Sequence, residues 1–188
     1  MSETREKPPA ARCCMGDMNA SPEESSPTPG KEMESRVGHT AYYSVVLDRS
    51  ASELWDVVRD FNNYPIYVNG VTESHIEDGL SGTTVGSFRD FAMGDVRTRQ
   101  RLLAHSDGER YFSYQSCGPT TIVEAGNERT MLAYVGTLRL RTIVEGNRCF
   151  AEWSSEYACP PEDANYWAAW WANSLPAWLS SIREHLAS

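Results

Sequence analysis

The chain of 188 residues is long enough for one domain with a sizeable core. Its formal net charge of −9 argues against a general nucleic-acid binder, because phosphate contacts need clustered Lys and Arg. No run of about 18 apolar residues is present, so we expect no membrane span. The N-terminus lacks the apolar core of a signal peptide, and we therefore expect a cytoplasmic protein.

Neither a disulfide framework nor a metal centre is expected from the cysteines and histidines. The five cysteines are odd in number and show no CxxC spacing, which favours free thiols in a chain without a signal peptide. The four histidines form no HExxH motif and no Cys/His cluster with zinc spacing. We therefore expect no metal and no cofactor. The residues concerned are Cys13, Cys14, Cys117, Cys149, Cys159, His39, His75, His105 and His185.

Residues 1–37 differ in composition from the rest of the chain. They are rich in Pro, Ser, Glu and Lys, and the segment SPEESSPTPGKEMES has almost no large apolar residue. Such a segment cannot bury enough apolar surface to offset its ordering entropy, so we expect a disordered tail. It is either a regulatory tail or an extended start with no role of its own. The folded domain is expected to cover residues 38–188.

A strand and a short helix are predicted at the start of this domain. The segment HTAYYSVVLD, residues 39–48, is rich in β-branched and aromatic residues, as strands are. Ser50 and Glu53 then form the signature of a capping box, in which each side chain accepts a hydrogen bond from the other residue's backbone N–H. The next apolar residues recur at helical spacing, so one helix face packs inward until the NNYP segment ends it. They are Leu54, Val57, Val58 and Phe61.

Six strand-like runs separated by turn signals follow. With the first strand they make about seven, joined mostly by short turns, which predicts an antiparallel sheet. No alternation of strands and helices appears, so a parallel Rossmann-like sheet is disfavoured. The segment GPTTIVEAGNE is interpreted as a connecting loop. The six runs cover residues 71–78, 86–93, 95–104, 109–116, 130–145 and 147–158.

The chain closes with a long helix in the segment EDANYWAAWWANSLPAWLSSIREHL. Its large apolar residues recur every three or four positions and form a broad stripe that needs a partner surface. The predicted fold class is therefore α+β: a curved seven-stranded antiparallel sheet wrapped around the C-terminal helix, with short helices after the first strand. The stripe consists of Trp167, Trp171, Leu175, Trp178, Ile182 and Leu186.

The stretch GDVRTRQRLL, residues 94–103, contains one residue that its surroundings do not explain. In a strand, Arg97, Arg99 and Arg101 share one face, and Gln100 shares the other face with mostly apolar residues. The arginines are explained by a solvated face, with local anion binding as the alternative. Gln100 is a surface residue, a hydrogen-bonded core residue or part of a site, and its apolar strand-mates favour an inward position.

Five pieces of sequence carry a resemblance to a known family: SELWDVVRDFNNYP, GSFRDF, RQRLLAHSDGERYFSYQ, TLRL and AEWSSEY. Their order resembles the START/polyketide-cyclase (SRPBCC) superfamily, above all its polyketide cyclase/dehydrase branch, whose relatives include lachrymatory-factor synthase and the abscisic-acid receptors. The resemblance spans about residues 40–185. It implies a helix-grip fold around a hydrophobic cavity. We expect the loop of residues 118–128 to form part of the rim of this cavity. The family includes cyclases, isomerases, lipid carriers and hormone receptors, so the fold does not decide the function.

The resemblance also implies three site residues. Members of this branch often carry an Arg in a GSxR motif, a Glu on the next strand and a later Tyr that take part in proton transfer. The matching positions here are Arg89, Gln100 and Tyr134. A glutamine cannot ionise, so it can orient a ligand by hydrogen bonding but cannot shuttle a proton. For Arg89 a structural salt bridge to Asp90 or Asp95 is the alternative, and Tyr134 is otherwise a core tyrosine.

Further ligand contacts are expected from aromatic and apolar side chains that face inward. In the family's fold the last helix forms the lid of the cavity, so part of its stripe meets the ligand. For each of these residues a purely structural role in the core is the alternative. The expected substrate-binding residues are Phe91, Trp153, Trp171, Leu175 and Trp178.

Two classes of function follow from the resemblance. In the first, the protein is an enzyme that cyclises, dehydrates or isomerises a small hydrophobic substrate. Arg89 then stabilises a developing oxyanion, Tyr134 donates a proton and Gln100 orients the substrate. In the second, it is a non-catalytic carrier or sensor of a hydrophobic small molecule, which fits the missing carboxylate. A third class, an assembly partner, requires exposed tryptophans on the last helix.

Overall fold

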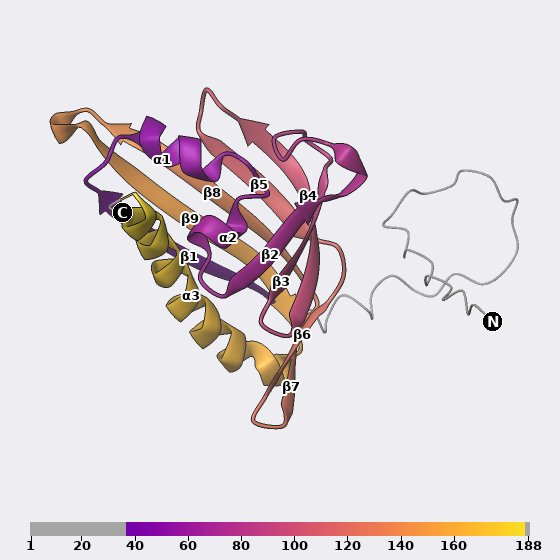
Figure 1. Cartoon of the computed structure of the whole chain (residues 1–188). Coiled ribbons are helices and arrows are strands. Elements are labelled where there is room, and N and C mark those ends of the chain that lie inside the picture. Colours follow the sequence, from indigo (N-terminus) through magenta and orange to yellow (C-terminus); the bar gives the residue numbers. More distant parts are fainter. Residues whose placement is uncertain (1–36, 187–188) are drawn as a thin grey trace, which may run out of the picture.

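A strongly curved antiparallel sheet of seven strands forms the larger part of the structure (Figure 1). The computed structural model describes residues 37–186, so the predicted disordered tail lies outside the described residues apart from Val37. The strand order is β1-β9-β8-β5-β4-β3-β2, and the predicted fold class is confirmed. The strands are β1 (Val37–Leu47), β2 (Val71–Ile76), β3 (Phe88–Met93), β4 (Val96–Ser106), β5 (Tyr111–Ser116), β8 (Ala133–Ile143) and β9 (Arg148–Cys159).

A separate hairpin stands between β5 and β8 in the chain. It consists of β6 (Thr120–Glu124) and β7 (Asn127–Met131), which pair only with each other among the described strands. The interpretation of residues 118–128 as a loop is therefore wrong. The hydroxyls of Thr121 and Thr130 lie 3.0 Å apart across the hairpin. Figure 1 shows the hairpin beside the first turns of the C-terminal helix.

Residues 37–186 contain the helices α1 (Ala51–Val58), α2 (Tyr64–Tyr67) and α3 (Ala164–His185), together with three single turns of 3-10 helix. The predicted capping box is confirmed: the Glu53 N–H donates to Ser50 Oγ at 3.2 Å, and the Ser50 N–H donates to Glu53 Oε2 at 2.9 Å. Helix α3 packs against β1, β9 and α2. Across residues 37–186, no helix has both the length and the apolar character that crossing a membrane requires.

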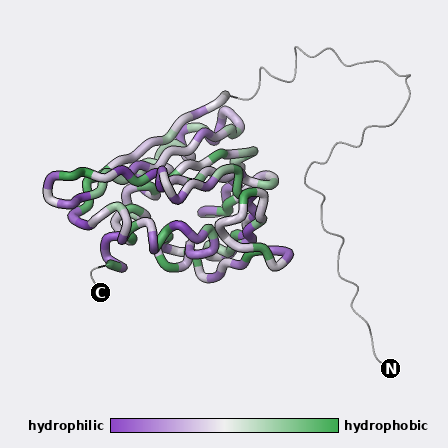
Figure 2. Tube along the Cα trace, turned by 90° about the horizontal axis from the view of Figure 1, so that it is seen from above, coloured by the Kyte–Doolittle hydropathy of each residue, from purple (hydrophilic) through white to green (hydrophobic). Residues whose placement is uncertain are grey.

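The core lies between the concave face of the sheet and the helices. Buried and more exposed residues alternate along the long strands β4, β8 and β9, so one face of each of these strands is buried. Figure 2 shows hydrophobic and hydrophilic residues interspersed along the chain. In β9, for example, Ala151, Trp153 and Tyr157 face inward. Helix α3 buries most of its aromatic stripe, with Trp167 fully buried. An assembly surface made of exposed tryptophans on this helix is therefore not supported.

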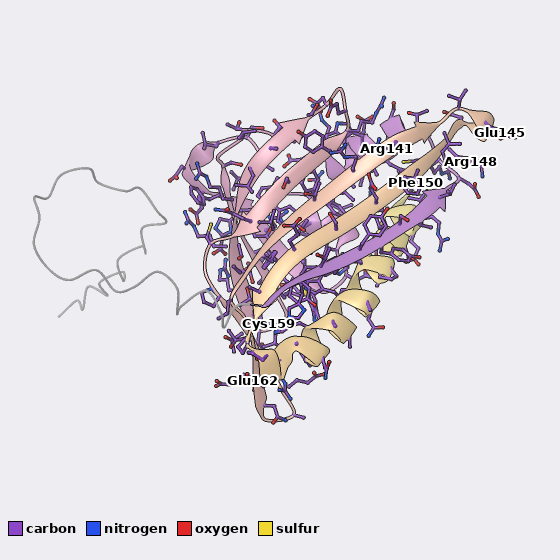
Figure 3. All side chains as sticks on the ribbon, turned by 180° about the vertical axis from the view of Figure 1, so that it is seen from behind. Arg141, Glu145, Arg148, Phe150, Cys159 and Glu162 are labelled. Carbon is purple, nitrogen blue, oxygen red and sulfur yellow. The ribbon has the colours of Figure 1, made fainter. Side chains whose placement is uncertain are left out.

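The outer face of the sheet is charged, as predicted for the arginines of β4. Arg97 Nη1 lies 2.5 Å from Glu73 Oε1, and Arg99 Nη2 lies 2.6 Å from Glu77 Oε2. Figure 3 shows this face from behind, with Arg141 on β8 among the labelled residues. These pairs are partly or largely exposed, so each contributes little to stability. Carboxylates beside these arginines also argue against an anion site here.

Candidate functional site

A partly enclosed cavity lies between the concave face of the sheet, α2, the β6–β7 hairpin and α3. Its volume is about 70 Å³. Half of its lining residues are aromatic and come from five elements, so the wall is assembled by the fold rather than by one motif. They are Tyr64, Phe91, Tyr114, Tyr134, Trp167, Trp170, Trp171 and Trp178.

The rest of the lining is apolar or neutral. The lining includes no Asp, Glu, His, Lys, Arg or Cys from residues 37–186, so tyrosine is its only titratable residue type. The wall therefore offers hydrogen bonds and apolar contacts but no ordinary general base. These remaining residues are Val68, Met93, Val96, Thr98, Gln100, Thr120, Ile122 and Met131.

Arg89 lies directly behind this wall and is completely buried. Its Nη1 donates a hydrogen bond to the carbonyl oxygen of Phe61, and its Nη2 donates to Gln100 Oε1. The guanidinium carbon lies 3.2 Å from the ring centroid of Tyr64 and 3.7 Å from that of Phe61. Aromatic faces thus surround the cation and stabilise it by cation–π attraction. Arg89 does not line the cavity itself.

The salt bridge that was the alternative for Arg89 is not present. Asp90 points to the outer face, where Arg97 Nε lies 2.5 Å from its Oδ1. In the part of the chain that the structure describes, no carboxylate lies within ion-pair distance of Arg89. The site therefore contains a buried positive charge whose contacts include a carbonyl, an amide and aromatic rings.

The register of β3 and β4 explains why Arg89 meets Gln100. The two strands are joined by a two-residue turn at Gly94 and Asp95, in which Gly94 has a φ of 57°. Counting back from this turn places Arg89 directly opposite Gln100. Both residues also face inward, because side chains alternate along each strand.

Gln100 connects Arg89 to Tyr134. Its exposed fraction is 2%, and its Nε2 donates a hydrogen bond to the Tyr134 hydroxyl oxygen. Tyr134 on β8 lines the cavity, and its backbone N–H donates to Ser116 Oγ at 3.1 Å. Burial raises the pKa of the Tyr134 hydroxyl, although the hydrogen bond from Gln100 and the charge of Arg89 act in the opposite direction. The hydroxyl is therefore protonated at neutral pH. The three residues implied by the resemblance thus form one hydrogen-bonded chain.

The floor of the cavity depends on a close approach between β5 and β8. Tyr114 lies opposite Gly136, and a Cβ atom on Gly136 would overlap the tyrosine ring. The Trp153 Nε1–H donates to the Tyr114 hydroxyl at 3.1 Å. Glycine is therefore required at this position for the ring of Tyr114 to lie across the strand.

The predicted ligand contacts are only partly at the cavity. Phe91, Trp171 and Trp178 line it. Trp153 is fully buried behind the wall, where its ring centroid lies 5.2 Å from that of Trp178. Leu175 lies instead at a groove between β1 and α3. Helical and strand spacing indicated which side chains face inward, but not how far each lies from the cavity.

Several lining residues were missed by the sequence reasoning. Trp170 follows Trp167 by three positions, a spacing that could have indicated it. Tyr64 begins α2 and Val68 directly follows this helix, in and just after a segment interpreted only as the end of a helix. Tyr114 is an inward residue of β5, which strand alternation alone could have indicated.

The β6–β7 hairpin closes one side of the cavity and is fixed to the start of α3. Ile122 and Met131 reach the lining from this hairpin. Asp163, just before α3, accepts a hydrogen bond from Arg129 Nη1 at 3.0 Å and one from the Thr130 backbone N–H at 2.9 Å. The hydrogen bond from Thr130 and the charge of Arg129 lower the pKa of the Asp163 carboxyl. This ionised carboxylate therefore holds the hairpin against the helix.

The titratable groups of the described residues do not gather into a metal site. Within residues 37–186, no three His, Cys, Asp or Glu side chains lie close enough together to hold a metal ion. The chemistry of this site is therefore to be sought in its hydrogen bonds, its charge and its aromatic wall.

A curved sheet that wraps around a long helix and a partly enclosed aromatic cavity defines a class, the ligand-binding proteins of the SRPBCC superfamily. A family model described as polyketide cyclase/dehydrase and lipid transport matches residues 38–187. The chain therefore belongs to this family, and the predicted resemblance is confirmed. No curated protein matches the chain in sequence.

Solved structures share the fold. A protein from Nitrosospira multiformis is 22% identical with a TM-score of 0.62, over 78% of this chain and 94% of its own. A protein from Thermobifida fusca is 20% identical with a TM-score of 0.62, over 77% and 91%. Norcoclaurine synthase from Thalictrum flavum, in complex with dopamine and hydroxybenzaldehyde, is 15% identical with a TM-score of 0.61, over 89% and 97%. At such identities the likeness shows the fold alone.

Proposed function

We propose that this protein binds a small hydrophobic carbonyl compound in its cavity and promotes its cyclisation, dehydration or isomerisation. The observation that carries the proposal is the hydrogen-bonded chain from Arg89 through Gln100 to Tyr134, which ends at the cavity wall. Tyr134 hydrogen-bonds the carbonyl oxygen and draws electron density away from the carbonyl carbon. Arg89 and Gln100 are positioning residues, because they act on the substrate through Tyr134.

The described residues of the wall include no carboxylate, and this limits the chemistry that is proposed. Without a general base, rate acceleration comes from polarising the carbonyl, from excluding water and from holding the substrate in a folded conformation. Intramolecular ring closure benefits most from such confinement, because both reacting carbons belong to one molecule. The proposal therefore favours cyclisation, followed by loss of water, over proton shuttling.

The volume of the cavity limits the size of the substrate. A water molecule needs roughly 10–15 Å³ of such space, so a cavity of about 70 Å³ holds about five to seven waters. This volume corresponds to a compound with a single ring. Larger polyketides require the wall to widen, and the partly exposed Trp170 and the β6–β7 hairpin are the elements at its edge.

A second candidate, a non-catalytic carrier or sensor, is favoured by the same absence of a base in the lining. In that case the hydrogen bond from Tyr134 fixes the orientation of the ligand and nothing more.

For either function we propose a cytosolic protein, in keeping with the absence of any disulfide between Cys117, Cys149 and Cys159.

Turnover of a linear triketone tests the enzyme proposal. In ring closure the terminal carbon loses a proton and bonds to the far carbonyl carbon, while the π bond of that carbonyl breaks and its oxygen takes up a proton. Loss of this hydroxyl as water and enolisation of the two remaining carbonyls then give a phenol, whose ultraviolet absorbance is followed. We expect Tyr134→Phe to lower the rate by about 100-fold, the loss typical of one removed hydrogen-bond donor. Tyr111→Phe is the matched control, because this tyrosine lies on the outer face with its ring 4.7 Å from Arg139 Cζ.

The same samples distinguish the two candidates. Binding of the triketone is followed by quenching of the fluorescence of the cavity tryptophans. An equal rate for the wild type and Tyr134→Phe would refute catalysis by this group. Binding without any turnover, together with a defined compound released from freshly purified protein in mass spectrometry, would favour the carrier.

A further inference from the structure

The hydrogen bonds around Gln100 can run in only one direction. A guanidinium has N–H donors and no acceptor, so the Gln100 oxygen must face Arg89, as observed. The amide nitrogen of Gln100 then faces Tyr134, and an amide nitrogen can only donate. The hydroxyl oxygen of Tyr134 therefore accepts this bond. Arg89 thus fixes the orientation of the amide and, through it, the role of the tyrosine.

The Tyr134 hydroxyl can therefore donate its proton in a hydrogen bond to a ligand in the cavity. Among residues 37–186, no hydrogen bond of the structure uses this proton, and Tyr134 lines the cavity. A ligand that satisfies it must present an acceptor oxygen at this point of the wall. A glutamate at position 100 would reverse the arrangement, because a carboxylate accepts from both Arg89 and Tyr134 and would draw the tyrosine proton away from the cavity.

With glutamine at position 100, no described residue compensates the charge of Arg89. An arginine and a glutamate side by side would sum to zero, whereas Arg89 with neutral Gln100 keeps one positive charge. Burial raises the pKa of the Tyr67 and Tyr114 hydroxyls well above the ordinary value, so neither supplies a negative charge. The carboxylate of Asp60 makes no ion pair with Arg89 and accepts from a backbone N–H at 2.8 Å. The titratable and charged groups around Arg89 and Tyr134 are Tyr64, Tyr67, Tyr114, Cys117 and Asp60.

We infer that the cavity selects its ligand as an oxyanion, an enolate or a phenolate, over the neutral form of the same compound. The oxyanion accepts the Tyr134 proton in a charge-assisted hydrogen bond, which is stronger than a neutral one. The buried charge of Arg89 attracts it through surroundings of low polarity, where Coulomb interactions are little screened. This inference rests on the cavity being the ligand site of the proposed function and names the class of compound that it takes.

Titration of bound 4-nitrophenol tests the inference, because the phenolate is yellow and the neutral phenol is not. The probe has a single ring, as the volume of the cavity requires. We expect saturating wild-type protein to lower the pKa of the probe by about one unit, the lower end of the effect of a neighbouring opposite charge. One unit corresponds to a roughly tenfold preference for the phenolate.

Matched probes and variants distinguish the effect of the ligand's charge on binding from the effect of its shape. The methyl ether 4-nitroanisole has nearly the same shape and cannot ionise, so it measures binding without the oxyanion. Gln100→Glu is expected to abolish the pKa shift of 4-nitrophenol and to change the affinity for 4-nitroanisole little. Gln115→Glu makes the same substitution one strand away, outside the cavity, and is expected to preserve the shift. Tyr134→Phe, which removes a single oxygen, is expected to reduce it.

The outcomes distinguish this inference from the proposed function. Binding of both probes by the wild type with an unchanged pKa of 4-nitrophenol would overturn the oxyanion preference and leave the cavity as the ligand site. An undiminished shift in both Gln100→Glu and Tyr134→Phe would also overturn it, because the charge and the proton of the wall would then have no effect. Binding of neither probe would overturn the proposed function, and the inference with it.

Discussion

The buried pair of Arg89 and Gln100 gives the sharpest prediction about stability. Gln100→Leu removes the acceptor of a buried cation and the donor to Tyr134. A hydrogen bond to a charged group contributes about 1.5–3 kcal/mol and a neutral one about 0.5–1.5 kcal/mol. Leucine regains part of this by burying apolar surface. We therefore expect the free energy of unfolding to fall by about 2–4 kcal/mol.

The partner substitution, Arg89→Met, is expected to cost a similar amount for a different reason. It leaves the Gln100 oxygen and the Phe61 carbonyl without their donor, at about 1–3 kcal/mol each, but relieves the desolvation of a buried charge. In the double variant the cation and its acceptor disappear together. The double variant should therefore lose about 2–3 kcal/mol less than the sum of the single variants.

Urea unfolding followed by tryptophan fluorescence measures these values, with an unchanged dependence on urea as the check that each variant still folds in the same way. The exposed pair of Arg59 and Asp107, with Nη2 and Oδ2 2.8 Å apart, is the control, and a double-mutant cycle there should give a coupling below about 1 kcal/mol. Additive losses at Arg89 and Gln100 would refute the reasoning, because they would mean that neither side chain depends on the other.

Three further predictions concern the floor, the hairpin and the first helix. Gly136→Ala should displace Tyr114, lower the stability by about 1–3 kcal/mol and change the near-ultraviolet circular dichroism, and an unaltered spectrum would contradict the close approach. Asp163→Asn should destabilise by about 1–3 kcal/mol at neutral pH. Folding lowers the pKa of the Asp163 carboxyl, so the wild type loses this stabilisation as the pH falls below about 4. The difference in unfolding free energy between the wild type and Asp163→Asn, measured by urea titration, should therefore disappear at low pH. A difference that stays constant with pH would argue against the ion pair with Arg129. Ser50→Ala should lower the melting temperature through a loss of about 1 kcal/mol, whereas Ser50→Gly should cost less, and equal losses would count against capping.

Much of the sheet and both longer helices could be predicted from the sequence, because period-two and helical spacing report directly on burial. The β6–β7 hairpin could not. Its strands are short and half-exposed, so they show no clear alternation, and Asp163 fixes them from a position remote in the sequence. An isolated two-stranded hairpin is only marginally stable, and local sequence carries little sign of a tertiary anchor.

The site, like the fold, could be predicted from the sequence only in part. The inward orientation of Gln100 follows from strand alternation, and its pairing with Arg89 follows from the two-residue turn at Gly94. The contact with Tyr134 does not follow, because it crosses from β4 to β8 over the intervening β5. The positions of Trp153 behind the wall and of Leu175 at the groove between β1 and α3 likewise depend on packing depth, which residue spacing does not encode.

The pairing of the first strand with the last has a consequence for biosynthesis. Tyr42 on β1 hydrogen-bonds Glu152 on β9, 110 positions further along the chain, and β1 pairs with no other strand of the described sheet. During synthesis on the ribosome, β1 therefore has no partner strand until nearly the whole domain has been synthesised. Such an edge invites pairing with other nascent chains. Dependence on chaperones during translation, rather than after it, is the expected result of this topology.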